Sequence, residues 1–188
     1  YGDKRRTQIS KDVDTEFSEE DLIPHQRVVV TLSNRGFVKR VTARNYRAQH
    51  RGGRGIIGMV TREADAVSLL AVADTHDALL FFTDRGRVFR IKCHEIPGES
   101  SRTSKGMAVV NLFPIAEGEG VTAMTAVTTY EPEVFFIMAT RLGEVKKTMV
   151  GNFANVRSSG LIAMDLEVIS NTGAYASRQA YVVSNAVK

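Results

Sequence analysis

A β-hairpin pattern stands in the middle of the chain, at Leu79-Leu80-Phe81-Phe82-Thr83-Asp84-Arg85-Gly86-Arg87-Val88-Phe89-Arg90. Two runs rich in apolar residues flank a short polar turn that ends at Gly86. Such a pattern is typical of a β-hairpin in which the glycine adopts a left-handed conformation and forms a bulge. These residues therefore predict two antiparallel strands joined by a tight turn.

The same pattern recurs on both sides of this hairpin, with its turn glycine at positions 36, 86 and 143, so the repeat period is 50 to 57 residues. Three features share this spacing: a hydroxyl residue three positions before the glycine, a valine two after it and a basic residue four after it. They are Ser33, Thr83 and Thr140; Val38, Val88 and Val145; and Arg40, Arg90 and Lys147. The even spacing of the last two places them on one strand face, with the basic residue near the strand end and able to reach water.

Each repeat contains a second anchor, in which a polar loop leads into a glycine and two apolar residues. These anchors are Gly55-Ile56-Ile57, Gly106-Met107-Ala108 and Gly160-Leu161-Ile162. A further apolar stretch follows at residues 67–72 and 121–127, which gives about four strands per repeat. Periods of this size are typical of all-β, propeller-like arrays with one four-stranded blade per repeat. Parallel β/α repeats are less well supported, because no 3.6-residue apolar pattern separates the strands.

The pattern divides the chain into a lead segment, residues 1–26, and about three blades at residues 27–78, 79–134 and 135–188. The lead segment is acidic from Lys11 to Asp21, and it predicts either a short helix from Asp14 that stops at Pro24 or a tether. Its acidic residues could mimic a polyanion, although a solvated linker explains them more simply. The third repeat loses the pattern after Glu167, and residues 181–185 could begin a fourth unit.

Composition indicates an ordinary globular protein, with 188 residues, 43% hydrophobic content and a net charge of +4. The single cysteine, Cys93, excludes an internal disulfide and suits a reducing cytosol. No apolar run approaches the ~20 residues that span a membrane, so we expect a cytoplasmic protein without membrane contact. The chain begins at Tyr1 rather than Met, which predicts a piece of a longer protein.

A glycine- and arginine-rich loop, Gln49-His50-Arg51-Gly52-Gly53-Arg54-Gly55, lies between strands of the first repeat. Glycines allow close approach to the main chain, and each arginine presents a charged planar fork that suits phosphate oxygens. From Arg35 to Arg62 no Asp or Glu interrupts the basic residues. This patch predicts an anionic partner, with nucleic acid as the leading candidate. A solvated strand face and a disordered RNA-binding segment are the alternatives, but such segments are repetitive and this loop occurs once.

The sequence indicates no enzymatic site. None of the four histidines has a partner at zinc-ligand spacing, so they are interpreted as ordinary surface histidines. Gly52-Gly53-Arg54-Gly55 is not a phosphate loop of the ATPase kind, because no Lys-Ser/Thr follows it. Gly-x-Ser-x-Gly is absent as well.

The repeats and the loop together resemble the C-terminal domain of DNA gyrase A subunits. Residues 49–55 look like the family's box, Gln-Arg-Arg-Gly-Gly-Lys-Gly, with His50 and Arg54 as the two departures. Tyr1-Gly2-Asp3-Lys4-Arg5-Arg6-Thr7 resembles the junction that leaves the family's DNA-cleavage core. The resemblance implies a β-pinwheel, a propeller-like wheel of normally six blades that exchange strands, of which about three are present here.

By the same resemblance the chain is a double-stranded DNA-binding and chiral DNA-wrapping domain that supports ATP-dependent negative supercoiling. It would be part of a type II topoisomerase, an isomerase, yet carry no catalytic residue, since none of its five tyrosines follows an arginine as the family's catalytic tyrosine does. The implied partners, in an A2B2 heterotetramer, are gyrase B subunits together with a second A subunit. No cofactor is expected in this chain, because ATP and Mg²⁺ belong to other domains. A topoisomerase IV-like subunit that relaxes or decatenates DNA and a propeller-like protein-interaction scaffold are the alternatives.

The resemblance also assigns residues to the DNA interface. Within the box, Arg51 and Arg54 would contact phosphates, Gly52, Gly53 and Gly55 would allow close approach, and Gln49 and His50 complete the loop. A basic rim on the blades would continue the contact. We predict that this rim comprises Lys39, Arg40, Arg44, Arg47, Arg85, Arg87, Arg90, Lys92, Arg102, Lys105, Lys146 and Lys147.

Overall fold

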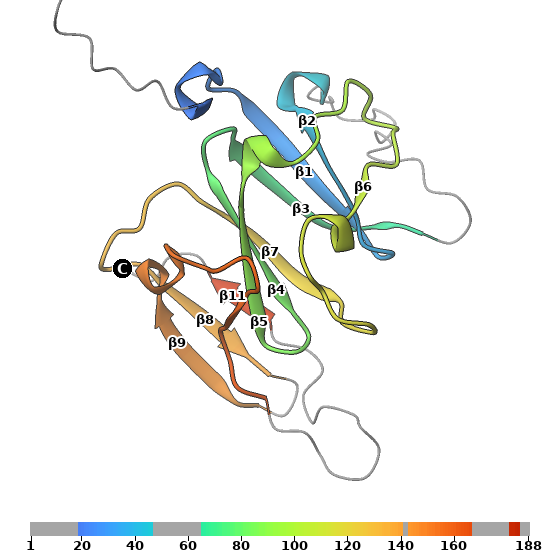
Figure 1. Cartoon of the computed structure of the whole chain (residues 1–188). Coiled ribbons are helices and arrows are strands. Elements are labelled where there is room, and N and C mark those ends of the chain that lie inside the picture. Colours follow the sequence, from blue (N-terminus) through green and yellow to red (C-terminus); the bar gives the residue numbers. More distant parts are fainter. Residues whose placement is uncertain (1–18, 47–64, 141–142, 167–180, 185–188) are drawn as a thin grey trace, which may run out of the picture.

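The computed structural model describes residues 19–46, 65–140, 143–166 and 181–184. These residues form three antiparallel sheets that follow one another along the molecule (Figure 1). The strands are β1 (Arg27–Ser33), β2 (Phe37–Thr42), β3 (Val67–Asp74), β4 (Ala78–Thr83), β5 (Arg87–Lys92), β6 (Met107–Ala108), β7 (Val121–Val127), β8 (Phe135–Ala139), β9 (Val145–Met149), β10 (Leu161–Ile162) and β11 (Tyr181–Ser184). The all-β prediction is confirmed.

The three repeated hairpins form as predicted. They are β1–β2, β4–β5 and β8–β9, and all three pair the residues beside the turn in the same register, with Leu32 opposite Val38, Phe82 opposite Val88 and Ala139 opposite Val145. The turn glycines at positions 36, 86 and 143 have φ angles of 78°, 73° and 89°. This left-handed conformation is the reason that glycine recurs there, since a side chain disfavours it.

The sheets do not follow the repeats in sequence. The first sheet has the order β3-β1-β2-β6 and the second has the order β10-β5-β4-β7. Strand β6 comes from the second repeat but pairs with β2, and β10 comes from the third repeat but pairs with β5. Each of these sheets therefore combines two of the segments 27–78, 79–134 and 135–188, and this is the strand exchange that a pinwheel implies.

The third sheet has the order β11-β8-β9. Strand β11 lies beside β8 as β3 lies beside β1 and β7 lies beside β4. The hypothesis that residues 181–185 begin a fourth unit is therefore wrong. The strand completes the third hairpin, because it occupies the place of the apolar stretch at residues 67–72 in the first repeat.

Two hydrophobic cores lie between successive sheets, and the alternation of side chains along β4 builds both. Leu79 and Phe81 face the first core, whereas Leu80 and Phe82 face the second, so every residue of β4 is buried. Phe113 packs against Phe81 in the first core, with ring centroids 5.1 Å apart. The second sheet is thus packed on both faces, which agrees with the unbroken apolar run of its central strand β4 from Ala78 to Phe82.

Short helices of the 3-10 type follow the strands and precede the first one. They are η1 (Glu19–Leu22), η2 (Ala43–Asn45), η3 (Cys93–Glu95), η4 (Val109–Asn111) and η5 (Val150–Phe153). The helix predicted to end at Pro24 is seen as the single turn η1, and its expected start at Asp14 lies outside the described residues. No helix in the described part of the chain is long and apolar enough to cross a membrane.

Candidate nucleic-acid interface

The box itself, Gln49 to Gly55, and Arg47 lie outside the described residues, so its role stays a prediction. The structure does describe the corresponding loop of the second repeat, residues 98–105, which leads into Gly106 and β6. Its last residues, Arg102-Thr103-Ser104-Lys105-Gly106, repeat the order Arg-x-x-basic-Gly of Arg51 to Gly55. The loop 98–105 therefore shows how a loop of this sequence type is held.

The loop 98–105 lies alongside β2. At one end the side-chain amide of Asn45 donates to the carbonyl of Ser100 at 3.1 Å, and the backbone N–H of Glu99 donates to the carbonyl of Arg40 at 2.8 Å. At the other end the ammonium group of Lys105 lies 3.9 Å from the ring centroid of Phe37. Contacts at both ends fix the path of the loop over the sheet.

Lys39 holds the middle of the loop 98–105 through hydrogen bonds to its backbone. Its side chain is fully buried, and its ammonium donates to the carbonyls of Arg102 and Ser104, the second at 2.8 Å. Burial lowers the pKa of Lys39, and the nearby charge of Glu99 opposes this shift. The prediction that Lys39 belongs to the solvent-facing rim is wrong, because its charge is used to hold backbone carbonyls.

Gly106 lets the loop close onto β2. Its φ angle is 80°, and a Cβ atom there would lie 2.4 Å from the carbonyl oxygen of Val38. No side chain fits at this distance, so glycine is required by both conformation and space. The same reasoning explains Gly160 in the third repeat, where a Cβ atom would lie 2.8 Å from the ring of Phe89.

The basic residues four positions after the first two turn glycines are partly engaged with the protein. Arg40 donates to the carbonyls of Ile96 and His94 at 3.0 and 3.2 Å, and Arg90 donates to the hydroxyl of Tyr130 at 3.1 Å. These acceptors are neutral, so both guanidinium groups keep their positive field while their positions are fixed. Arg40 and Arg90 can therefore contribute to the potential of the surface.

Two of the predicted rim residues are paired with carboxylates. Arg87 forms a two-pronged ion pair with Glu119, whose side chain is fully buried, and Lys92 lies 2.6 Å from a carboxylate oxygen of Glu20. Burial alone would raise the pKa of Glu119, but hydrogen bonds and the charge of Arg87 outweigh it and lower the pKa. Arg87 and Lys92 therefore add less to the positive potential of the surface than the sequence suggests. Arg85, another predicted rim residue, donates to the carbonyl of Glu117 at 2.6 Å.

The remaining rim residues reach solvent. Lys146 donates to the carbonyl of Ala163 at 2.8 Å but stays exposed, and the ammonium of Lys147 lies 4.0 Å from the ring centroid of Phe135. Neither forms an ion pair with a carboxylate in the described part of the chain, and the same holds for the exposed Arg44 and Lys105 and the half-buried Arg102. This set offers separate cations on the first and third sheets, which suits successive phosphates.

The interface residues assigned from sequence also omit an exposed cation in the third repeat. Arg157 lies three residues before Gly160, in the loop of the third repeat that corresponds to the loop 98–105, and it is exposed. Alignment of the loops on Gly55, Gly106 and Gly160 places Arg157 opposite Gly52 and Thr103, one position after Arg51 and Arg102, so strict spacing gave no signal for it.

Comparisons with known proteins place this architecture in a family. A family model described as "DNA gyrase C-terminal domain, beta-propeller" matches residues 27–74 and 77–128. The A subunit of DNA gyrase from Dehalogenimonas lykanthroporepellens is 58% identical over 88% of the chain, and that of Clostridium acetobutylicum is 42% identical over the same share. The chain spans about 20% of the length of each of these relatives.

Solved structures agree with the fold. The C-terminal domain of a DNA topoisomerase IV superposes with a TM-score of 0.65 at 24% identity, over 85% of this chain and 46% of the other. A DNA gyrase A C-terminal domain superposes with a TM-score of 0.62 at 21% identity, over 76% of this chain and 44% of the other. Because the family model covers more than half of the residues and the strand exchange is that of a pinwheel, the chain belongs to the family of DNA gyrase C-terminal β-propeller domains.

Proposed function

We propose that the chain binds double-stranded DNA and wraps it with a fixed hand, as part of the A component of a gyrase. The observation that carries this proposal is the loop 98–105. Its Arg102 and Lys105 repeat the spacing of Arg51 and Arg54, and the buried Lys39 holds its backbone in place. A rigid loop that presents two cations is suited to neighbouring phosphates and carries no base code.

The arrangement of the sheets gives the wrap its geometry. The sheets follow one another, so equivalent loops recur along one path and a duplex in contact with all of them must bend. Bending a site of 20–30 base pairs costs on the order of 1–6 kcal/mol, which many phosphate contacts can offset. Because strand twist gives the array one hand, we expect the bound DNA to follow one hand as well.

The activity of the whole protein is also proposed from the relatives, whose names identify them as A subunits of DNA gyrase. We propose that the chain supports ATP-dependent negative supercoiling within an A2B2 complex in the cytoplasm. ATP, Mg²⁺ and strand cleavage would then be handled by other parts of that complex. This chain would supply the chirality of the wrap.

Salt-dependent affinity for a long duplex tests the proposal. Two charge-removing double variants are compared with a control: Arg51→Ala/Arg54→Ala, Arg102→Ala/Lys105→Ala and, in the lead segment, Lys4→Ala/Arg5→Ala. Each removes two positive charges. If two phosphate contacts are lost, the slope of log affinity against log salt should become shallower by about 1.8, since each neutralised phosphate contributes about 0.9.

The control distinguishes the loss of particular phosphate contacts from a general effect of lower net charge. We expect the Lys4→Ala/Arg5→Ala chain to keep the slope of the unmodified chain, while both loop variants lose affinity. Equal losses of affinity in all three variants would mean that the net charge matters and the position of the removed cations does not. An affinity that does not change with salt would overturn the proposal.

A further inference from the structure

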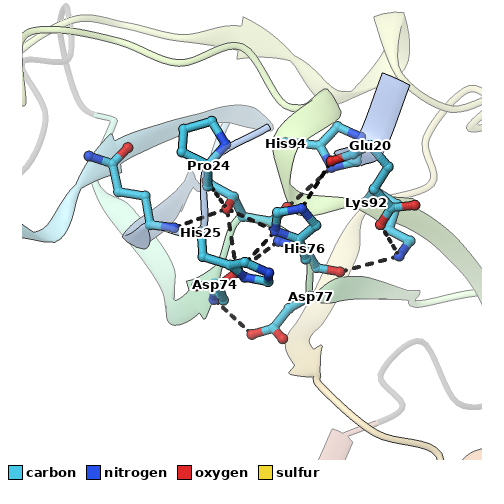
Figure 2. Close-up of polar contacts among 10 residues, drawn as sticks. Glu20, Pro24, His25, Asp74, His76, Asp77, Lys92 and His94 are labelled. Atoms are coloured by element: carbon cyan, nitrogen blue, oxygen red, sulfur yellow. Dashed lines mark hydrogen bonds and ion pairs between the residues drawn. The ribbon is translucent and has the colours of Figure 1, made fainter. Parts of the chain in front are cut away.

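Three side chains with metal-ligating atoms meet on the surface away from the basic loops. His25 precedes β1, whereas Asp74 and His76 lie at the turn between β3 and β4 (Figure 2). The interpretation of all four histidines as ordinary surface residues is wrong for His25 and His76, whose rings stack with centroids 3.8 Å apart and which both contact Asp74. Strand β1 pairs with β3 with Arg27 opposite Asp74, so the fold brings together residues that are about fifty positions apart in sequence.

The distances suit one small cation. The Nδ1 atom of His25 lies 2.8 Å from Oδ1 of Asp74, and Nδ1 of His76 lies 3.4 Å from the same oxygen. All three ligand atoms lie within 4.8 Å of one another. Neighbouring ligands of a tetrahedral zinc ion are about 3.3 Å apart, given zinc–ligand distances near 2.0–2.1 Å. Around an ion the two nitrogens would approach each other and the His25–Asp74 pair would move apart by about 0.5 Å, and the His25 side chain, which is 76% exposed, has room for this shift.

The contacts of His76 determine which of its ring nitrogens faces Asp74. Its Nε2 lies 3.2 Å from the backbone carbonyl of Glu20, so this nitrogen is engaged with the chain that precedes β1. Its Nδ1 is left to face Oδ1 of Asp74, and Nδ1 of His25 approaches the same oxygen. The hydroxyl of Thr75 donates to the carbonyl of Pro24 at 2.8 Å. The three ligand atoms therefore converge on one point beside the β3–β4 turn.

The backbone around the cluster is tied down. The N–H of Gln26 donates to the hydroxyl of Thr75 at 3.1 Å, and the N–H of Thr75 donates to the carbonyl of Gln26 at 3.1 Å. The N–H of Asp74 donates to a carboxylate oxygen of Asp77 at 2.7 Å. Two ligands therefore stand on a fixed turn, and the Glu20 carbonyl orients the ring of His76, as outer partners do for metal-bound imidazoles.

We propose that His25, Asp74 and His76 bind a divalent transition-metal ion of the zinc type, with water completing the coordination. Two imidazoles and one carboxylate match zinc, whereas magnesium prefers oxygen ligands and octahedral geometry. The ion would clamp residues 20–26 onto the β3–β4 turn, beside the Lys92–Glu20 ion pair. It would thereby fix the direction in which the chain enters the first sheet, independently of DNA.

Titration calorimetry of the 188-residue chain with Zn²⁺ tests the site, with Co²⁺ as a spectroscopic probe of tetrahedral coordination. We expect saturation at one ion per chain. His25→Gln, Asp74→Asn and His76→Gln should each weaken binding by about tenfold or more. His94→Gln is the matched control, because the ring of His94 is 6.2 Å from that of His76 and its Nδ1 faces the carbonyl of Thr75.

Thermal unfolding gives a second measurement that distinguishes loss of the metal site from failure to fold. Zn²⁺ should raise the thermal midpoint of the unmodified chain and of His94→Gln, but not that of His25→Gln, whose side chain is exposed and dispensable for the core. Absence of saturable binding, or equal binding by all four variants, would overturn the site. His25→Gln should keep its DNA affinity, so failure here is separate from failure of the wrapping proposal.

Discussion

Two glycines at the same position of the repeated hairpin allow a matched perturbation. Gly36 and Gly86 have φ angles of 78° and 73°, so alanine suffers the same conformational penalty at either site. Their surroundings differ. A Cβ atom at Gly36 meets nothing within 4 Å, whereas one at Gly86 would lie 2.0 Å from the carbonyl oxygen of Met164.

The structure gives the expected magnitudes. The left-handed conformation costs about 1–2 kcal/mol for alanine at both positions. At Gly86 the segment that leads from β10 must also move away. That movement breaks the bonds that the N–H groups of Ala163 and Met164 donate to the Gly86 carbonyl at 2.8 and 3.1 Å. Each such bond contributes about 1 kcal/mol, so Gly86→Ala should destabilise by about 3–4 kcal/mol in total.

Urea unfolding followed by circular dichroism measures this difference. We expect the free energy of unfolding to fall by about 1–2 kcal/mol for Gly36→Ala and by about 2 kcal/mol more for Gly86→Ala. Equal losses of unfolding free energy in the two variants would refute the reasoning, because they would mean that the segment after β10 does not pack closely against Gly86.

Four further outcomes are expected. Glu119→Gln should destabilise the chain by about 3 kcal/mol at neutral pH, because it breaks a buried ion pair with Arg87. Because the pKa of Glu119 is lowered in the folded chain from an unfolded value of 4.5, its carboxylate stabilises the fold above that pH. In acid unfolding of the unmodified chain this contribution should disappear as the pH falls below 4.5, whereas the Glu119→Gln chain should show no such loss. Phe153→Ala should cost about 3–5 kcal/mol in denaturant unfolding, since its ring is fully buried against Phe82. Lys39→Met should weaken DNA affinity in fluorescence anisotropy although Lys39 is buried, because the loop 98–105 loses its anchor, and an unchanged affinity would contradict this role. Burial raises the pKa of Cys93 to about 12, so a thiol reagent should modify it in the unfolded chain but not in the native chain at about pH 8.

The local parts of the fold were accessible from sequence. Turn glycines, β-branched runs and their spacing depend on neighbouring residues, so the hairpins and the all-β class could be predicted. Strand exchange was expected only through the family resemblance and not from the residues themselves, because the pairing of β10 with β5 depends on packing between repeats. The continuous apolar run from Leu79 to Phe82 implied burial on both faces of β4 but not which sheet would lie on each.

Parts of the site needed the structure. Lys39 aligns with Phe89 when the hairpins are matched on their glycines, and this equivalence with an apolar residue was a sign of burial that charge counting ignored. The pairing of Arg87 with Glu119 joins residues 32 positions apart and had no local signal. The meeting of His25 with His76 likewise depends on the register of β1 and β3.

The topology of DNA closed around the protein tests the central claim most directly. Nicked circular DNA is ligated with enough of the 188-residue chain for complete retardation in a gel, and the topoisomers are then resolved in two dimensions after removal of the protein. A chiral wrap predicts that the centre of the distribution moves away from the protein-free control in one direction only, and moves further as more chain is added. Complete retardation with an unmoved centre would contradict the claim, because the chain would then bind DNA without imposing a hand on it.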